Sequence, residues 1–295
     1  MICEDRVVIV TGAGRGLGRS HAEALVRAGA KVVVNDLGVE RDGAAQGKPV
    51  AEEVAAQLRA LGGEAVASTH DISDWESAEA LVRQTVDTFG RLDCVVNNAG
   101  ILRDRMIVNT TVEEWDDVIR VHLRGTFAML RFAAAYWREQ AKGGNPVEAS
   151  VVNTTSPSGL FGKPGQANYG SAKAGIATLT MIAAEELGRY GVTVNAVAPV
   201  AYTRMTADLV TGDGASRVLA PEYVSPLVVW LASPRSRHVT GRVFELSGKR
   251  FGIAEPWRHG PGTVPDGVPE PEEAGAIAES LLACAAPPER MGGNL

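Results

Sequence analysis

Cysteines are few in this sequence, and it has neither an excess of basic charge nor long apolar runs. The three cysteines, Cys3, Cys94 and Cys284, are odd in number and far apart, which fits neither a disulfide framework nor the spacing of metal ligands. We therefore predict reduced thiols and no bound metal. No apolar run approaches the roughly 18 residues that a membrane-spanning helix needs, and the first residues lack the pattern of a secretory signal. These absences predict a cytoplasmic protein with no membrane partner.

An excess of basic residues is also missing. The 295 residues include 35 acidic and 29 basic side chains, for a formal net charge of -6, and the two signs are interspersed. No basic stripe indicates a nucleic-acid partner, and no polybasic run indicates a membrane surface. With 45% apolar residues, the chain is long enough to bury a sizeable core. We therefore expect the partner to be a small-molecule substrate.

Short apolar runs alternate with longer amphipathic segments between residues 6 and 246. The strand candidates are VVIV, KVVVND, EAVAST, DCVVNN, ASVVNT, VTVNAVAP and RVFEL. Helices are predicted near residues 17–28, 50–61, 74–89, 112–141, 167–189 and 221–232. Strands that alternate with helices predict a single Rossmann-type, doubly wound α/β domain, with a seven-stranded parallel sheet and helices on both faces.

The composition changes near residue 250. We predict a catalytic, dinucleotide-binding domain over residues 1–250 and an irregular Pro/Gly-rich extension over 251–295, which contains one short helix in PEEAGAIAESLLAC. The polar, glycine-rich residues 38–49 predict a loop between the second strand and its helix.

A glycine-rich turn, TGAGRGLG, follows the first strand. Gly12 permits a tight turn, Gly16 lets the backbone approach a pyrophosphate, and Gly18 lets the next helix pack closely. Arg15 and Leu17 lie between these glycines. An ordinary strand-to-helix turn would explain the glycines alone, but their place after the first strand of a βαβ pattern favours a dinucleotide site.

The second strand ends at Asp36, twenty-four residues after Gly12. A carboxylate there accepts hydrogen bonds from the adenosine ribose and repels a 2′-phosphate, so it favours NAD over NADP. Arg15 competes with this interpretation, because a guanidinium can pair with a 2′-phosphate. A simple turn or helix-capping role is the alternative for Asp36. We give Asp36 more weight than Arg15 and expect NAD.

Two further strand ends are expected to contact the cofactor. Asp71 and Ile72 follow the third strand, where they would meet the adenine, although Asp71 is almost equally suited to cap the next helix. Asn98, Ala99 and Gly100 follow the fourth strand, and their small size would let a flat cofactor lie against the backbone.

The segment TSPSGLFGKPGQANYGSAK contains the candidate catalytic residues. Tyr169 and Lys173 are four residues apart, so they share one face of a helix, and Ser156 lies thirteen residues before the tyrosine. Each of these residues alone is more often a packing, surface or capping residue. Their joint occurrence after a dinucleotide-type glycine loop favours catalysis.

With TGAGRGLG, Asp36, NNAG and the Ser156, Tyr169 and Lys173 set, residues 6–250 resemble the short-chain dehydrogenase/reductase family. The motifs VVVNDLG, NNAGILRDRM, RVHLRG and GQANY are most similar to the (3R)-hydroxyacyl-CoA dehydrogenase domain of the peroxisomal multifunctional enzyme and its bacterial relatives. This resemblance implies NAD-dependent interconversion of a secondary alcohol and a ketone, Pro199 beside the nicotinamide, and a homotetramer.

Chemistry assigns roles to these residues. Tyr169 would be the acid/base, Lys173 would lower the phenol pKa and position the cofactor, and Ser156 would stabilise the substrate oxygen. His122 stands where most members of the family have the asparagine of a proton relay, and its pKa near 6.5 would make that relay pH-sensitive. A histidine that only fills space in a helix is the alternative.

The sequence also departs from the family at Val200 and Arg204, near a predicted substrate lid over residues 200–220. Arg204, Arg103 and Arg105 are candidates for contacting an anionic substrate, or else are simply exposed arginines.

The preferred function is a dehydrogenase for 3-hydroxyacyl-CoA or hydroxysteroid substrates. An NADPH-dependent 3-oxoacyl carrier-protein reductase is the enzymatic alternative. A non-catalytic NAD-binding regulatory module is a third reading, and it would predict a broken Ser/Tyr/Lys set.

Overall fold

The computed structural model of the protein describes residues 1–38, 50–202, 218–255 and 257–291. The chain forms two compact units, Met1–Ala254 and Glu255–Leu295. The first unit contains every buried residue of the described chain. In the second unit, helix α10 (Pro271–Cys284) is the regular element, and none of the described residues is buried.

An eight-stranded sheet with the order β3-β2-β1-β4-β5-β6-β7-β8 forms the centre of the first unit. Its strands are β1 (Val7–Thr11), β2 (Lys31–Asn35), β3 (Ala65–Ser68), β4 (Cys94–Asn97), β5 (Ala149–Thr154), β6 (Val192–Val200), β7 (Val243–Ser247) and β8 (Arg250–Ala254). All neighbouring pairs are parallel except β7 and β8. The strand order reverses direction between β1 and β4, which opens a crevice at the carboxyl ends of these strands.

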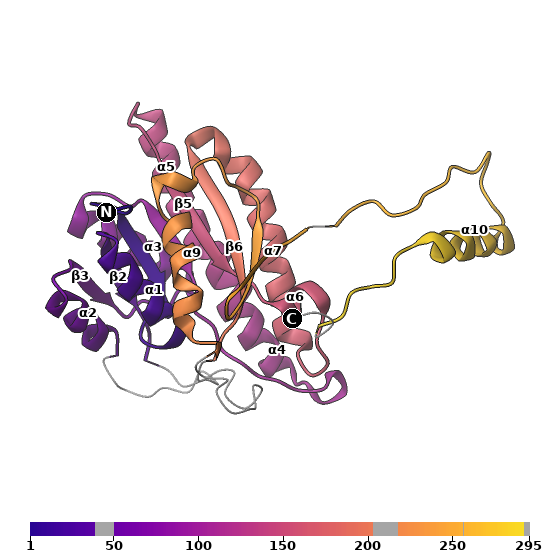
Figure 1. Ribbon diagram of the computed structural model, residues 1–295, viewed down its shortest axis with the longest axis horizontal. Helices are drawn as coiled ribbons and strands as arrows, with labels where there is room; N and C mark the ends of the chain where they lie inside the picture. Colours follow the sequence, from indigo (N-terminus) through magenta and orange to yellow (C-terminus); the bar gives the residue numbers. More distant parts are fainter. Residues whose placement is uncertain (39–49, 203–217, 256, 292–295) are drawn as a thin grey trace. The chain divides into compact units, whose positions relative to one another are not determined.

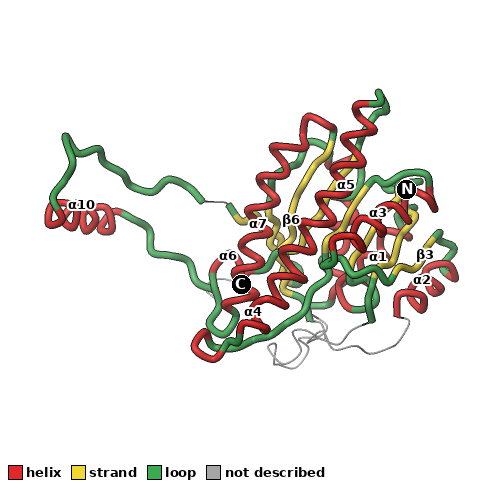
Figure 2. Tube along the Cα trace, turned by 180° about the vertical axis from the view of Figure 1, so that it is seen from behind, coloured by secondary structure: helices red, strands yellow, loops and turns green. Residues whose placement is uncertain are grey.

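Helices lie on both sides of the strands (Figures 1 and 2). The described helices of this unit are α1 (Gly16–Arg27), α2 (Val50–Ala60), α3 (Trp75–Phe89), α4 (Val112–Ile119), α5 (Gly125–Lys142), α6 (Pro157–Phe161), α7 (Ala167–Leu187) and α9 (Ser225–Leu231). Short 3₁₀ turns occupy Ile107–Asn109, Gly188–Tyr190, Pro221–Tyr223 and Pro234–Ser236. Among the described residues, no helix has the length and apolar character needed to cross a membrane.

Alternating side chains of the buried strands contribute to two large apolar clusters, one on each face of the sheet. In β1, Val8 and Val10 join a cluster with residues of α1, α2 and α9, whereas Ile9 joins a cluster with residues of α3, α5 and α7. This division follows from the two-residue period of a strand, and it explains why central strands that are covered on both faces are apolar throughout. The three cysteines are free.

The prediction of a parallel sheet covered by helices on both faces is confirmed, with an additional antiparallel strand. Strand β8 pairs with β7 through a tight turn at Gly248, whose φ of 53° suits glycine. Strand β8 is not predicted from the sequence, because RFGIA is largely exposed and contains a glycine, so it lacks the apolar pattern of a central strand.

The helix expected over residues 112–141 is interrupted. A π-helical turn, Arg120–Arg124, separates α4 from α5. The short helix α6 was also missed, because five residues beginning with Pro157 carry no readable apolar period. Most of the expected loop 38–49 and most of the expected lid 200–220 fall outside the described residues, as does Arg204.

Candidate active site

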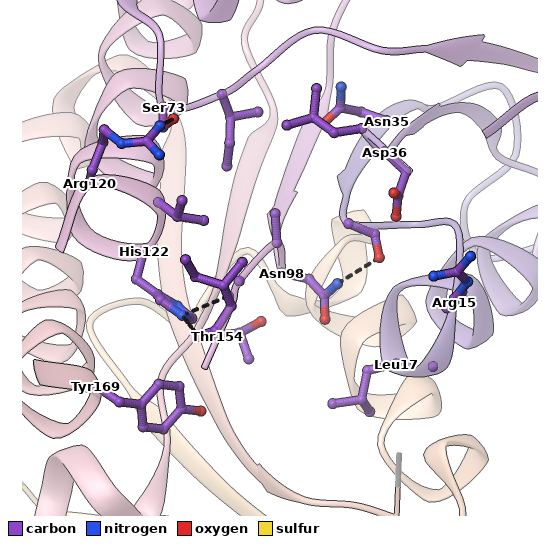
Figure 3. A pocket seen from close by; sticks show the side chains of 18 of the residues that line it. Arg15, Leu17, Asn35, Asp36, Ser73, Asn98, Arg120, His122, Thr154 and Tyr169 are labelled. Carbon is purple, nitrogen blue, oxygen red and sulfur yellow. Dashed lines mark hydrogen bonds between the residues drawn. The ribbon is translucent and has the colours of Figure 1, made fainter. Parts of the chain in front are cut away.

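A cavity of about 450 Å³ opens at the carboxyl ends of β1, β2 and β4. It brings together most of the residues proposed from sequence, although they are widely separated in the chain (Figure 3). Its lining includes Gly12, Arg15, Gly16, Leu17, Asp36, Asp71, Ile72, Asn98, Ala99, Gly100, His122, Tyr169, Lys173 and Pro199. Gly18 and Ser156 are outside this lining, and both are buried.

Close packing around the glycine loop requires glycine at two of its positions. Gly12 has a φ of 63°, and a Cβ there would lie 2.7 Å from the Cα of Ala99. A Cβ on Gly18 would overlap the carbonyl of Gly12 and the side-chain amide of Asn98. The turn can therefore pass close to β4 and to the start of α1 only with glycines at both positions.

Asn98 holds this loop in place. Its Nδ2 donates to the carbonyl of Thr11 at 2.9 Å and to that of Gly12 at 3.1 Å, and its backbone N–H donates to Thr11 Oγ1 at 2.9 Å. From sequence, residues 98–100 are expected to accommodate the cofactor through their small size. The structure shows in addition that Asn98 connects β4 to the loop after β1.

Asp36 both shapes the loop and lines the cavity. Its two carboxylate oxygens accept backbone N–H bonds from Gly14 and Gly38, each at 2.8 Å. The turn role that the sequence left open is therefore present. It is compatible with the expected cofactor role, because a carboxylate has about four acceptor positions and the bonds from these two described residues use two of them.

Asp71 does not cap α3, so that part of the prediction is wrong. The N-cap is Asp74, whose side chain accepts from the backbone N–H of Ser77 at 2.8 Å. Asp71 instead accepts bonds from Ser73 N at 2.8 Å and Ser73 Oγ at 2.7 Å, and it lies 3.8 Å from Arg120. These contacts hold its carboxylate at the wall of the cavity.

Helix α7 positions Tyr169 and Lys173 one turn apart. The Lys173 Nζ lies 5.6 Å from the centre of the Tyr169 ring and donates a 2.6 Å bond to the Thr154 carbonyl at the end of β5. Thr155 Oγ1 donates to the Lys173 carbonyl at 2.7 Å. Sequence reasoning missed both threonines, since Thr154 acts through its backbone and no motif marks Thr155.

Ser156 is the N-cap of α6, where its hydroxyl accepts from the Ser158 N–H at 3.2 Å. The same side chain acts on the Tyr169 phenol and lowers its pKa, in opposition to burial. A second contact fixes this region, because Ser158 Oγ donates to Gln166 and Gln166 donates to Asp104, at 2.7 and 2.8 Å. The capping role and the expected contact with the reacting groups are thus both compatible with the position of Ser156.

Burial is the largest influence on the pKa values of Tyr169 and Lys173. It raises the pKa of Tyr169 to about 12, against the opposing hydrogen bond from Ser156, and it lowers the pKa of Lys173 to about 7. The expected lowering of the phenol pKa by the ammonium is therefore not found in the protein alone. The physical reason is that desolvation penalises both charged forms at once.

His122 lies in the π-helical turn and contacts Tyr169 edge-to-face, with ring centres 5.2 Å apart. Burial, together with the charge of Lys173, lowers its pKa to about 3. The pH sensitivity expected from a pKa near 6.5 is thus contradicted, because the buried ring stays neutral over the physiological range.

The arginines proposed to meet an anionic substrate have carboxylate partners. Arg103 lies 3.2 Å from Asp117, and Arg105 lies 3.0 Å from Glu114. Arg103 also lines the cavity. Within the described chain, no group of three or more His, Cys, Asp or Glu side chains is placed to hold a metal ion.

The reversal point of the sheet, the glycine loop and the strand-end carboxylate define a Rossmann-type α/β protein. More narrowly, the chain belongs to the short-chain dehydrogenase family, whose family model matches residues 6–213.

Three similar proteins support this assignment. Hydroxyacyl-CoA dehydrogenase ChsB1 of Mycobacterium tuberculosis is 47% identical, covering 85% of this chain and 80% of that protein. The peroxisomal multifunctional enzyme type 2 of Mus musculus is 43% identical over 84% of this chain, which spans 32% of that protein. A crystal structure of a short-chain dehydrogenase from Mycobacterium avium matches with a TM-score of 0.91 and 52% identity, covering 99% of this chain and 100% of the other.

Proposed function

We propose that this protein is an NAD-dependent dehydrogenase that interconverts a secondary alcohol and a ketone on a 3-hydroxyacyl-CoA or hydroxysteroid. The observation that carries the proposal is that Tyr169 and Lys173 line the same cavity as the glycine loop and Asp36. The similarity to hydroxyacyl-CoA dehydrogenase ChsB1 supports the acyl-CoA class of substrate.

The residues present fit a dinucleotide. Gly12 and Gly16 line the cavity and carry no side chain, so a pyrophosphate can approach their backbone, and Asp36 offers acceptors to a ribose. When bound, the nicotinamide supplies the hydride acceptor and a positive charge.

Within this arrangement, Tyr169 takes the hydroxyl proton of the substrate in oxidation and returns it in reduction. Lys173, one turn along α7, favours the phenolate when it is charged and offers donors to the nicotinamide ribose. Ser156, whose side chain lowers the pKa of the phenol, is assigned to hold the substrate oxygen as its charge develops.

Turnover tests this assignment. Purified protein with NAD⁺ is assayed against 3-hydroxyacyl-CoAs of several chain lengths and against 17β-hydroxysteroids, with formation of NADH followed by absorbance. We expect Tyr169→Phe to lower kcat by roughly 10²–10⁴-fold while NADH binding is retained, because only the proton transfer is removed.

Tyr190→Phe is the matched control, because Tyr190 lies in the 3₁₀ turn after α7 and is not part of the cavity lining. If Tyr169→Phe turned over as fast as the wild type, Tyr169 would not be the acid/base. If the wild type itself turned over none of these substrates, a non-catalytic NAD-binding role would replace the proposal.

One observation favours a second function. Arg15 lines the cavity beside Asp36, and a 3-oxoacyl-[acyl-carrier-protein] reductase of Synechocystis is 38% identical over 82% of this chain. A clear preference for NADPH in kcat/KM, with reduction of a 3-oxoacyl carrier-protein substrate, would favour this alternative.

A further inference from the structure

Asn168 lies in the first turn of α7, directly before Tyr169, and its side chain is 1% exposed. The backbone N–H groups of a first turn have no partner inside the helix. Gln166, the N-cap residue of α7, makes no side-chain cap bond within the described chain. Asn168 Oδ1 accepts instead from the backbone N–H of Tyr169 at 2.7 Å. The side chain of Asn168 therefore satisfies an amide that the helix leaves unpaired.

The amide nitrogen of Asn168 bonds to two other segments. Its Nδ2 donates to the carbonyl of Arg103 at 3.0 Å and to the carbonyl of Glu114 at 3.2 Å. Arg103 follows β4, and Glu114 lies in α4. Because Nδ2 has two hydrogens, both of its donor positions are used. One buried side chain thus links the start of α7 to α4 and to the segment after β4.

The same three segments enclose Tyr169. Its side chain packs against a small apolar cluster of Ile101, Val118 and Ala172, which belong to the segment after β4, to α4 and to α7. Apolar contacts have no preferred direction, so three buried side chains alone do not fix how these segments lie against each other. Hydrogen bonds depend on both distance and angle, and those of Asn168 therefore set the arrangement around the phenol ring.

We propose that Asn168 is a positioning residue, which fixes Tyr169 at the cavity by tying the first turn of α7 to α4 and to the segment after β4. The proposal rests on the proposed function in one respect, since Tyr169 is taken as the acid/base. Residues 98–100, at the end of β4, line the part of the cavity where the cofactor is expected. Asn168 thus places the phenol relative to the strand against which the cofactor would lie.

Asn195 provides a matched control for the purely structural effect of removing a buried amide. It is also 1% exposed, its Nδ2 donates to the Val239 carbonyl at 2.8 Å, and its Oδ1 accepts from the Arg242 N–H at 3.1 Å. Neither asparagine is part of the cavity lining. Replacing either one by alanine leaves buried backbone groups unpaired, so urea unfolding should show similar losses of stability for both variants.

Turnover per folded molecule separates positioning from stability. We expect Asn168→Ala to lower kcat about 10–100-fold, because displacing a reacting group by about 1 Å is costly. The dissociation constant for NADH should stay within about twofold, since the glycine loop is untouched. Asn195→Ala should retain the wild-type kcat. A wild-type kcat in Asn168→Ala, or an equal loss in Asn195→Ala, would overturn the proposal.

An isosteric replacement tests the two donated bonds. Asn168→Asp keeps the shape and the acceptor for the Tyr169 N–H, but its carboxylate has no donor and would face the carbonyl oxygens of Arg103 and Glu114. We expect kcat to fall at least as far as in Asn168→Ala. If Asn168→Asp kept the wild-type kcat, the bonds to Arg103 and Glu114 would have no part in placing the phenol, and the proposal would be rejected.

A readout that needs no substrate separates this proposal from the proposed function. The protein is produced with 3-fluorotyrosine, and the fluorine resonance of Tyr169 is assigned by its absence from Tyr169→Phe. We expect this resonance to move or broaden in Asn168→Ala and to stay in place in Asn195→Ala. An unmoved resonance in Asn168→Ala overturns the positioning role. A moved resonance in a protein that turns over no alcohol or ketone upholds that role while rejecting the proposed function.

Discussion

Asp36 illustrates how one side chain serves both the loop and the cavity. Its two oxygens are each bound by a backbone N–H, from Gly14 and Gly38, so the carboxylate has a fixed orientation before any ligand arrives. The space beside it is tight, because a Cβ on Gly14 would lie 2.8 Å from Asp36 Oδ2. A preorganised acceptor loses little entropy on binding ribose hydroxyls.

Replacing Asp36 tests the expected choice of cofactor. Asp36→Asn removes the charge but keeps one acceptor oxygen. Hydrogen bonds to charged groups contribute about 1.5–3 kcal/mol, so kcat/KM with NAD should fall about 10–100-fold, and kcat/KM with NADP should rise as repulsion of the 2′-phosphate disappears. Asp74→Asn, which changes a carboxylate outside the cavity lining, is the control. An unchanged ratio of the two values would show that Asp36 does not select the cofactor.

Some functional residues were readable from sequence and others were not. Gly12, Tyr169 and Lys173 were predicted because their chemistry depends on residue type at fixed spacing. Thr154 acts through its carbonyl, and any residue type would provide the same group. Gly100 was predicted to lie at the site, but its contact with His122 spans twenty-two positions and becomes visible only once the π-helical turn is known.

At the scale of single elements, α3 shows the limit of reading helix starts from sequence. Asp71 and Asp74 are both suited to capping, and they lie only three residues apart. The structure selects Asp74, while Asp71 is occupied by the N–H and hydroxyl of Ser73. At its other end, α3 stops at Gly90, whose φ of 76° suits glycine. The main body of α3 was therefore predictable, but the division of labour between the two aspartates was not.

This division predicts opposite effects for the two aspartates. Asp74→Ala removes the cap and should lower the free energy of unfolding by about 1 kcal/mol, with an unchanged KM for the dinucleotide. Asp71→Ala should raise that KM, because Asp71 lines the cavity. Urea unfolding and steady-state kinetics on both variants check the prediction. A larger loss of stability in Asp71→Ala, with normal KM, would reverse the assignment.

On the scale of the whole molecule, stability is concentrated in the first unit. The two large apolar clusters of the central sheet belong to it, whereas no described residue of Glu255–Leu295 is buried. A helix of about the length of α10 is only marginally stable in water without packing. The strand and helix pattern of the first unit was predictable because burial imposes a period, and the extension offered no such period.

Buried histidines couple the stability of this unit to pH. His21, on α1, is bonded through Nδ1 to Ser225 at 2.8 Å, and burial lowers its pKa from 6.5 to about 3. Below pH 6.5 the unfolded chain takes up a proton that the folded protein does not accept until about pH 3. The contribution of neutral His21 to the free energy of unfolding is therefore complete above pH 6.5, and it is lost as the pH falls from 6.5 to about 3.

We expect His21→Asn to reduce the steepness with which the free energy of unfolding falls between pH 6.5 and about 3. Urea unfolding across this range measures it. His259→Asn, at an exposed position in the second unit, should leave the slope as it is in the wild type. If the His21→Asn and wild-type curves remain parallel, acid unfolding has another origin.

Lys173 is hydrogen-bonded through both its side chain and its backbone to the residues at the end of β5. Thr154 holds the ammonium and Thr155 holds the backbone carbonyl, at 2.6 and 2.7 Å. A second bond joins the same two elements further along, where Asn153 Nδ2 on β5 donates to Thr180 Oγ1 on α7 at 2.9 Å. In mechanical terms, α7 is attached to β5 at two points of its length, and Tyr169 lies one turn from the first of them. The lysine thus keeps the tyrosine in register with the strand.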